Sequence, residues 1–179
     1  MVLPVLLLGH PKLKDISKEV DDKNLNLRDK LISEMFETLH KANGVSLSAV
    51  QVGYPFRIFV IELNLKKEKF HFKETFINPE IIDYSKRTVK KYEGCLSAPG
   101  VIPLIERPES IKLTYYDVNN IKHTKNFSGE VSRLIQHEME HLDGDIYINK
   151  INQLWYDTLK PTIDKIKNRD IENLGYLYK

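Results

Sequence analysis

The chain has 179 residues, of which 41% are hydrophobic and 29% charged, with a formal net charge of +2 at pH 7. These values predict a soluble protein with one domain and a sizeable core, and the mild charge argues against a nucleic-acid-binding surface. No apolar stretch reaches membrane-spanning length, the N-terminus lacks a signal-peptide pattern, and the single cysteine, Cys95, is typical of a reducing compartment, so we expect a cytoplasmic protein.

Residues 25–42 predict an amphipathic helix, because their apolar side chains recur near helical spacing. Gly44 follows at a position where helices commonly end. Segments 57–63, 76–82 and 87–94 are then rich in β-branched and aromatic residues and predict short strands.

Residues 111–117 and 121–127 flank a Val-Asn-Asn turn and predict a β-hairpin. Ser128 is expected to cap a helix that Gly144 can end, and a last helix is expected to begin at Pro161. This order of elements predicts an α+β fold in which antiparallel β-sheets pack around a central helix, with one further helix near each end of the chain.

The stretch IQHEMEHLDG (135–144) carries two histidines four residues apart, His137 and His141, with Glu138 directly after the first. On a helix, side chains at this spacing lie on one face, so both rings can reach one cation while the glutamate points at a water beside it. The pattern indicates that the central helix binds a metal and supplies its own general base.

Two imidazoles leave a metal under-coordinated, and the sequence after them offers no good third ligand. One branch of the metalloproteases has a third histidine at the position of Tyr147, and Asp143 and Asp145 are awkwardly placed for chelation. Upstream, EGCLSAPG (93–100) contains Cys95, whose thiolate with two imidazoles would leave a fourth position for water. The missing ligand favours this role over that of a buried free thiol.

Three stretches in order resemble the peptide deformylase family, and the likeness spans nearly the whole chain. GVSLSAVQ (44–51) is similar to the family's GxGLAAxQ, EGCLS (93–97) is intact, and QHEMEH (136–141) is similar to QHExDH. The resemblance implies that residues 1–179 form a single catalytic domain, which removes the formyl group from the N-terminal methionine of newly made proteins.

The resemblance also implies roles for nine residues. One divalent metal ion, ferrous iron in the cell and zinc or nickel as purified, would be bound by Cys95, His137 and His141. Glu138 would act as general base on the attacking water and pass the proton to the departing amine. The side-chain amide of Gln51 and the backbone N–H of Leu96 would stabilise the oxyanion, Val45 and Ser46 would pair with the substrate, and Gly94 would let it approach closely.

The chain departs from the family pattern at three positions, where Ser46 replaces glycine, Ser48 replaces alanine and Glu140 replaces aspartate. We expect Ser46 to narrow the cleft or to project away from it, and Glu140 to shift a hydrogen bond made to a metal ligand. None of the three removes a ligand, the base or an oxyanion donor, so we expect an active enzyme.

The expected partners are N-formylmethionyl nascent peptides at the ribosome, with no nucleic-acid specificity and no membrane. Two alternative functions remain at this stage. One is a zinc peptidase that uses the same helix, and the other is a non-catalytic binder of N-terminal peptides.

Overall fold

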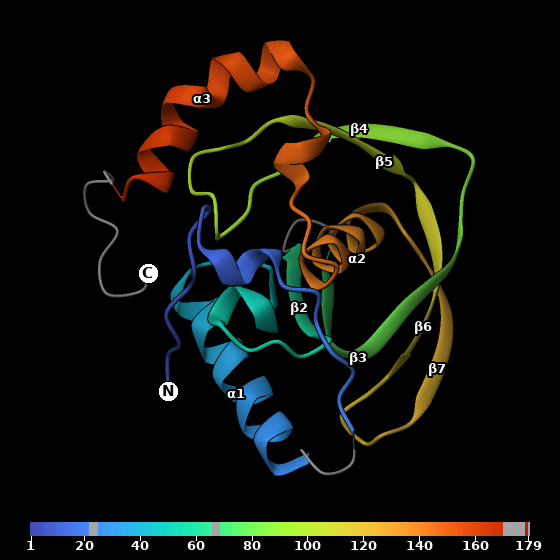
Figure 1. Ribbon diagram of the computed structural model, residues 1–179. Coiled ribbons are helices and arrows are strands. Elements are labelled where there is room, and N and C mark those ends of the chain that lie inside the picture. The colour runs from blue at the N-terminus through green and yellow to red at the C-terminus, as the bar shows by residue number, and fades with distance from the viewer. Residues whose placement is uncertain (22–24, 66–68, 170–177, 179) are drawn as a thin grey trace.

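The computed structural model describes residues 1–21, 25–65, 69–169 and 178, and its fold is α+β, as predicted (Figure 1). The described elements follow one another in this order: η1 (Pro11–Lys14), α1 (Leu25–Lys41), β1 (Ser46–Ser48), η3 (Ala49–Val52), β2 (Ile58–Leu65), β3 (Phe70–Tyr84), β4 (Thr88–Tyr92), β5 (Leu104–Pro108), β6 (Ser110–Tyr116), β7 (Lys122–Ser128), α2 (Gly129–Leu142), η5 (Tyr147–Lys150) and α3 (Gln153–Lys167).

Two antiparallel sheets surround α2, which lies at the centre of the molecule with α1 and α3 outside (Figure 1). The larger sheet has the strand order β1-β2-β3-β6-β7, and the smaller one pairs β4 with β5. Strand β1 lies at the end of this order and pairs only with β2 among the described strands. Its other edge is therefore open to a further extended chain.

The core explains why α2 is central. One face of the larger sheet contributes aromatic side chains such as Phe59, Phe76 and Tyr115 to a cluster that also contains Ile135 and Leu142 of α2. A second cluster packs α1 against β1 and β2, and a third packs the N-terminal segment and α3 around Tyr147. Burial of this apolar surface holds α2, and with it the side chains of α2, in a fixed position.

The N-terminal segment links two loops that lie far apart in sequence. The backbone N–H of Leu6 donates to the carbonyl of Gln51 at 2.7 Å, and that of Leu8 donates to the carbonyl of Ser97 at 2.7 Å. Because these bonds are backbone bonds inside a packed cluster, they hold both loops at fixed positions.

The sequence predictions for α1, the strands and the hairpin are confirmed, with β3 longer than expected. Ser128 is the N-cap residue of α2, although its side chain forms no capping hydrogen bond. The predicted start of the last helix at Pro161 is wrong. Helix α3 begins at Gln153, because the Asn152 side chain accepts from Trp155 N–H, and Pro161 lies inside the helix.

No helix among the described residues is long and apolar enough to cross a membrane.

Candidate metal centre

Helix α2 presents His137 and His141 to the same side, as their spacing predicted. Their rings lie 5.1 Å apart between centroids, and the two residues are 5% and 1% exposed. Cys95 reaches them from the loop after β4, with its Sγ 3.2 Å from His141 Nε2. The ligand atoms of these three residues all lie within 4.8 Å of one another.

This donor set fits a divalent metal ion. Sulfur and imidazole nitrogen are ligands for zinc and for other first-row metals, and three protein ligands leave a position open for water or substrate. The ring orientations support the fit, since Nδ1 of His137 faces Glu93 and Nδ1 of His141 is buried without a hydrogen-bond partner among the described residues. The ring nitrogen of His141 that faces Cys95 is Nε2.

The electrostatics of the centre shift the pKa values of the two histidines in opposite directions. Burial opposes protonation of His137, but hydrogen bonds with Cys95 and Glu93 outweigh it and raise the pKa of His137 to about 10. Burial, together with charge on His137 and Arg107, lowers the pKa of His141 well below its usual value. A cation bound among these side chains would take the place of the proton.

A buried ion network stands behind His137. Its Nδ1 lies 3.3 Å from Glu93 Oε2, and Glu93 also accepts hydrogen bonds from Arg107 and Arg133. Burial opposes ionisation of Glu93, yet the hydrogen bonds with His137 and Arg107 lower its pKa to about 2. Glu93 is therefore a carboxylate that can fix the ring of a metal-binding histidine.

Glu140, one of the three departures from the family pattern, belongs to this network through its contact with Arg107. It binds the Arg107 guanidinium through both carboxylate oxygens and pairs with Lys150. The expected hydrogen bond from Glu140 to a ligand histidine is not present, because Glu93 occupies that role.

Gln51 extends from η3 into the centre. Its Nε2 donates to Ser97 Oγ at 3.1 Å and lies 3.4 Å from Cys95 Sγ. The backbone N–H of Leu96 forms no hydrogen bond within the described part of the chain. The Gln51 amide and the Leu96 N–H, which come from separate loops, thus both lie next to Cys95.

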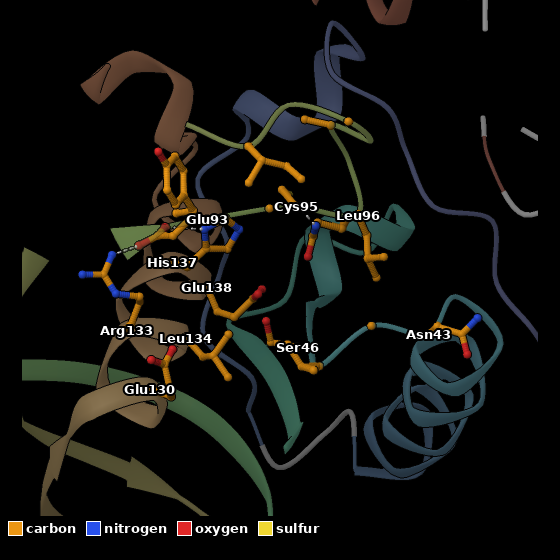
Figure 2. Close-up of a pocket in the computed structure, with 18 residues that line it drawn as sticks. Asn43, Ser46, Glu93, Cys95, Leu96, Glu130, Arg133, Leu134, His137 and Glu138 are labelled. Carbon is orange, nitrogen blue, oxygen red and sulfur yellow. Dashed lines mark hydrogen bonds and ion pairs between the residues drawn. The ribbon is translucent and has the colours of Figure 1, made fainter. Parts of the chain in front are cut away.

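A cavity of about 410 Å³ opens beside the centre, and Figure 2 shows its lining. Glu138 is 1% exposed and projects from α2 into this lining. Burial raises the pKa of Glu138, and charge on His137 and the side chains of Ser46 and Ser48 oppose the rise. Of the nine predicted site residues all but His141 line the cavity: Val45, Ser46, Gln51, Gly94, Cys95, Leu96, His137 and Glu138.

The cavity edge includes the open side of β1. The Val45 carbonyl accepts from Glu62 N–H at 2.9 Å, so it faces β2. Because backbone groups alternate along a strand, the N–H and carbonyl of Ser46 face the open edge. At Gly94 an added Cβ would meet nothing within 4 Å, which leaves free space on that side.

Sequence reasoning missed the buried network. Glu93 stands inside the EGCLS stretch but received no role, and Arg107 and Arg133 carried no recognisable pattern. The three residues come from different elements, and only the fold shows that they meet. The one feature of the sequence that could have indicated a role for Glu93 is its position close to the proposed ligand Cys95.

Comparisons with known proteins agree on one family. A family model described as polypeptide deformylase matches residues 2–155. A peptide deformylase of Wolbachia sp. (strain wRi) is 37% identical over 175 residues, which cover 94% of this chain and 97% of that protein. The peptide deformylase of Chlorobaculum parvum is 35% identical over 168 residues, 93% of this chain and 89% of that protein.

Solved structures give the same result. The peptide deformylase of Ehrlichia chaffeensis matches with a TM-score of 0.85 and 32% identity, covering 97% of this chain and 99% of that chain. A class I type b peptide deformylase of Acinetobacter baumannii, solved with Met-Ala-Ser bound, matches with a TM-score of 0.80 and 30% identity, over 84% of this chain and 99% of that chain.

Proposed function

This chain belongs to the polypeptide deformylase family, and from that premise we propose which of its residues perform the reaction. The enzyme is a hydrolase that removes the N-formyl group from the N-terminal methionine of newly made proteins and releases formate. It depends on a metal, and its substrates are N-terminal peptides.

We propose that Cys95, His137 and His141 are the metal ligands and that the ion in the cell is Fe2+, with Zn2+ or Ni2+ in protein purified in air. The proximity of the three ligand atoms and the Nε2 of His141, which faces Cys95, support this assignment. When bound, a divalent ion would polarise the formyl carbonyl and make water acidic enough to supply hydroxide near neutral pH.

Glu138 is the proposed general base. It accepts a proton from the attacking water as the water oxygen bonds to the formyl carbon, and it then delivers that proton to the amine nitrogen as the carbon–nitrogen bond breaks. A carboxylate with a raised pKa suits this double role. Its pKa lies closer to the pH at which the enzyme works, so the group can both accept and release a proton. Its place in the cavity wall, next to His137, supports the assignment.

Gln51 and Leu96 are the proposed oxyanion donors. The Nε2 of Gln51 and the backbone N–H of Leu96 come from two loops that the N-terminal segment holds in place. Donors fixed before the reaction begins stabilise developing negative charge without reorganisation, and each is worth about 3–4 kcal/mol.

The substrate backbone is proposed to pair with the open edge of β1. Ser46 offers its N–H and carbonyl there, whereas Val45 contributes mainly through its side chain, since its carbonyl is bound to β2. Gly94 lines the opposite side and leaves room for the peptide. The Met-Ala-Ser bound in the Acinetobacter baumannii structure supports a short N-terminal peptide as the occupant of this cleft.

We further propose that residues 1–179 act as one catalytic domain, since the site draws on segments from β1 to α2 and each of them packs into one of the three hydrophobic clusters. The proposed substrates are nascent chains at the ribosome. Such chains are made in the cytoplasm, which is therefore the proposed location.

The observation that most supports these roles is the meeting of Cys95 with the two α2 histidines at the wall of the cavity. The test is formate release from a formyl-Met tripeptide by anaerobically purified protein, together with metal analysis. We expect one metal per chain and turnover. Cys95→Ala should lose both, because two imidazoles bind a divalent ion weakly, and retention of full metal occupancy would refute the ligand assignment.

A further inference from the structure

Two serine side chains of β1 lie on the same side of the strand. Residues two apart on a strand point to the same face, so Ser46 and Ser48 project together while Leu47 projects to the other side. Leu47 packs in the cluster with α1, and the serines face α2 and the site. Both serines stand where the family pattern has residues without a hydroxyl.

Ser48 contacts the amide of Gln51. Its backbone N–H donates to Gln51 Oε1 at 2.8 Å, and its hydroxyl donates to the same oxygen at 3.0 Å. Because a backbone N–H can only donate, it must face the amide oxygen and not the amide nitrogen. The amide nitrogen is therefore turned to the opposite side, toward Cys95 and Ser97.

Ser46 faces the carboxyl group of Glu138. Figure 2 shows the Ser46 hydroxyl pointing toward this carboxyl group, and both residues line the same cavity. Among the described residues the Ser46 hydroxyl is committed to no other hydrogen bond, so its proton is available to Glu138.

A glutamate in this position needs such a neighbour. Glu138 is 1% exposed, and its Oε2 has no hydrogen-bond partner among the described residues. A long side chain held by no hydrogen bond can take several rotamers, and fixing one of them costs conformational entropy. A hydroxyl that donates to the carboxylate would favour the rotamer in which the group faces the cavity.

We propose that Ser46 and Ser48 are positioning residues for the deformylation reaction: Ser46 holds the carboxylate of Glu138, and Ser48 holds the amide of Gln51. One strand thereby sets both the base and an oxyanion donor. Each hydroxyl has a single proton, and Ser48 donates its proton to Gln51, so Ser46 is the serine left to donate to Glu138. This inference rests on the roles proposed for Glu138 and Gln51.

The test compares wild type with Ser46→Ala, Ser46→Thr and Ser48→Ala on one formyl-Met tripeptide. Ser85→Ala is the matched control, because Ser85 is a half-buried serine outside the cavity whose hydroxyl contacts only backbone groups of Arg87 and Ser110. For every variant kcat and KM, metal content, the thermal midpoint and the affinity for the deformylated Met-tripeptide are measured. The last three need no turnover and report directly on metal, fold and cleft.

Ser46→Ala should lower kcat about tenfold, the effect of losing one hydrogen bond to a charged group, with KM and product affinity unchanged. Ser46→Thr keeps the hydroxyl and should retain most of the rate. Ser48→Ala should lower kcat by only about threefold, because its backbone N–H still holds Gln51. Ser85→Ala should match wild type in kcat, KM, metal content and product affinity.

Three results would overturn the proposal. The first is an unchanged kcat in Ser46→Ala while wild type releases formate. The second is a lower KM with tighter product binding at unchanged kcat, which would show that Ser46 merely crowds the cleft. The third is a rate loss that follows metal loss or a lower thermal midpoint and that Ser46→Thr does not restore. Absence of formate release by wild type would instead refute the proposed function of the site.

Discussion

Glu93 lies with its Oε2 3.3 Å from Nδ1 of His137, and each side chain is only 6% exposed. A carboxylate that binds the far nitrogen of a ligand imidazole fixes the ring orientation and raises the basicity of the other nitrogen. Glu93 is itself held by Arg107 and Arg133, so its orientation is well determined. The proposed metal centre would therefore depend on a residue that is not itself a ligand.

Glu93→Gln should weaken metal binding about 10- to 100-fold, because the neutral amide orients His137 less strongly. The measurement is competition for the metal with a chelator of known affinity. Glu106→Gln is the control, since Glu106 is an exposed glutamate on β5 that contacts Thr88 and Lys90. Equal metal affinity in wild type and Glu93→Gln would show that the carboxylate serves the fold alone.

Local patterns predicted the parts of the structure that follow from periodicity. The two histidines had to share a face once their segment was helical, and the hairpin followed from two strands around a short turn. Strands β1 and β5 escaped prediction, because three residues of β1 show no period and β5 holds a glutamate, an arginine and a proline in five residues. Their pairing partners define them as strands.

The buried network and the serine contacts could not be predicted for a related reason. The pairing of Glu93 with Arg107 and Arg133 joins the loop after β4 to β5 and α2, and charged residues of this kind are common on surfaces. Ser46 was expected to narrow the cleft or point away, and its orientation depends on the register of β1 against β2. The start of the last helix was predicted wrongly at Pro161, because proline favours the first turn of a helix. In the structure Asn152 caps this helix earlier in the chain.

Glu138→Gln should keep the metal and lose most turnover, because it preserves the shape of the side chain but cannot accept the proton. General bases typically contribute 10²–10⁴-fold, so we expect a fall in kcat of about that size. Metal content and formate release are measured on the same preparation. Glu109→Gln, at a glutamate paired with Arg87 outside the cavity, is the control. A near-normal rate would eliminate Glu138 as the base.

Glu62 should stabilise the fold in a pH-dependent way. The hydrogen bond with Lys73 lowers the pKa of Glu62 to about 2 from the usual 4.5, with His40 contributing and burial opposing. A lowered pKa in the folded state means that the stabilisation is complete above pH 4.5 and is lost as the pH falls toward 2. Lys73 is 45% exposed, so the pair should contribute at most about 1 kcal/mol.

The measurement is urea unfolding of wild type and Glu62→Gln at pH 7 and at steps down to pH 2.5. The difference in unfolding free energy should be largest at pH 7 and shrink through the acid range. Lys73→Met, and the double variant, complete a cycle that isolates the pair. A difference in unfolding free energy that stays constant with pH would mean that the charge of the Glu62 carboxylate does not stabilise the fold.

Gly94 and Gly44 both border the cavity, but substitution should affect substrate binding at Gly94 and stability at Gly44. A Cβ at Gly44 would lie 2.8 Å from side-chain carbons of both Leu39 and Leu96, whereas one at Gly94 would meet nothing within 4 Å. Gly94→Ala should therefore leave the thermal midpoint and metal content unchanged and raise KM, because the methyl group occupies space that the peptide needs. Gly44→Ala should lower the midpoint, since overpacking typically costs about 1–3 kcal/mol. Thermal unfolding and steady-state kinetics on both variants check this contrast, and an unchanged KM in Gly94→Ala would show that the peptide does not pass beside Gly94.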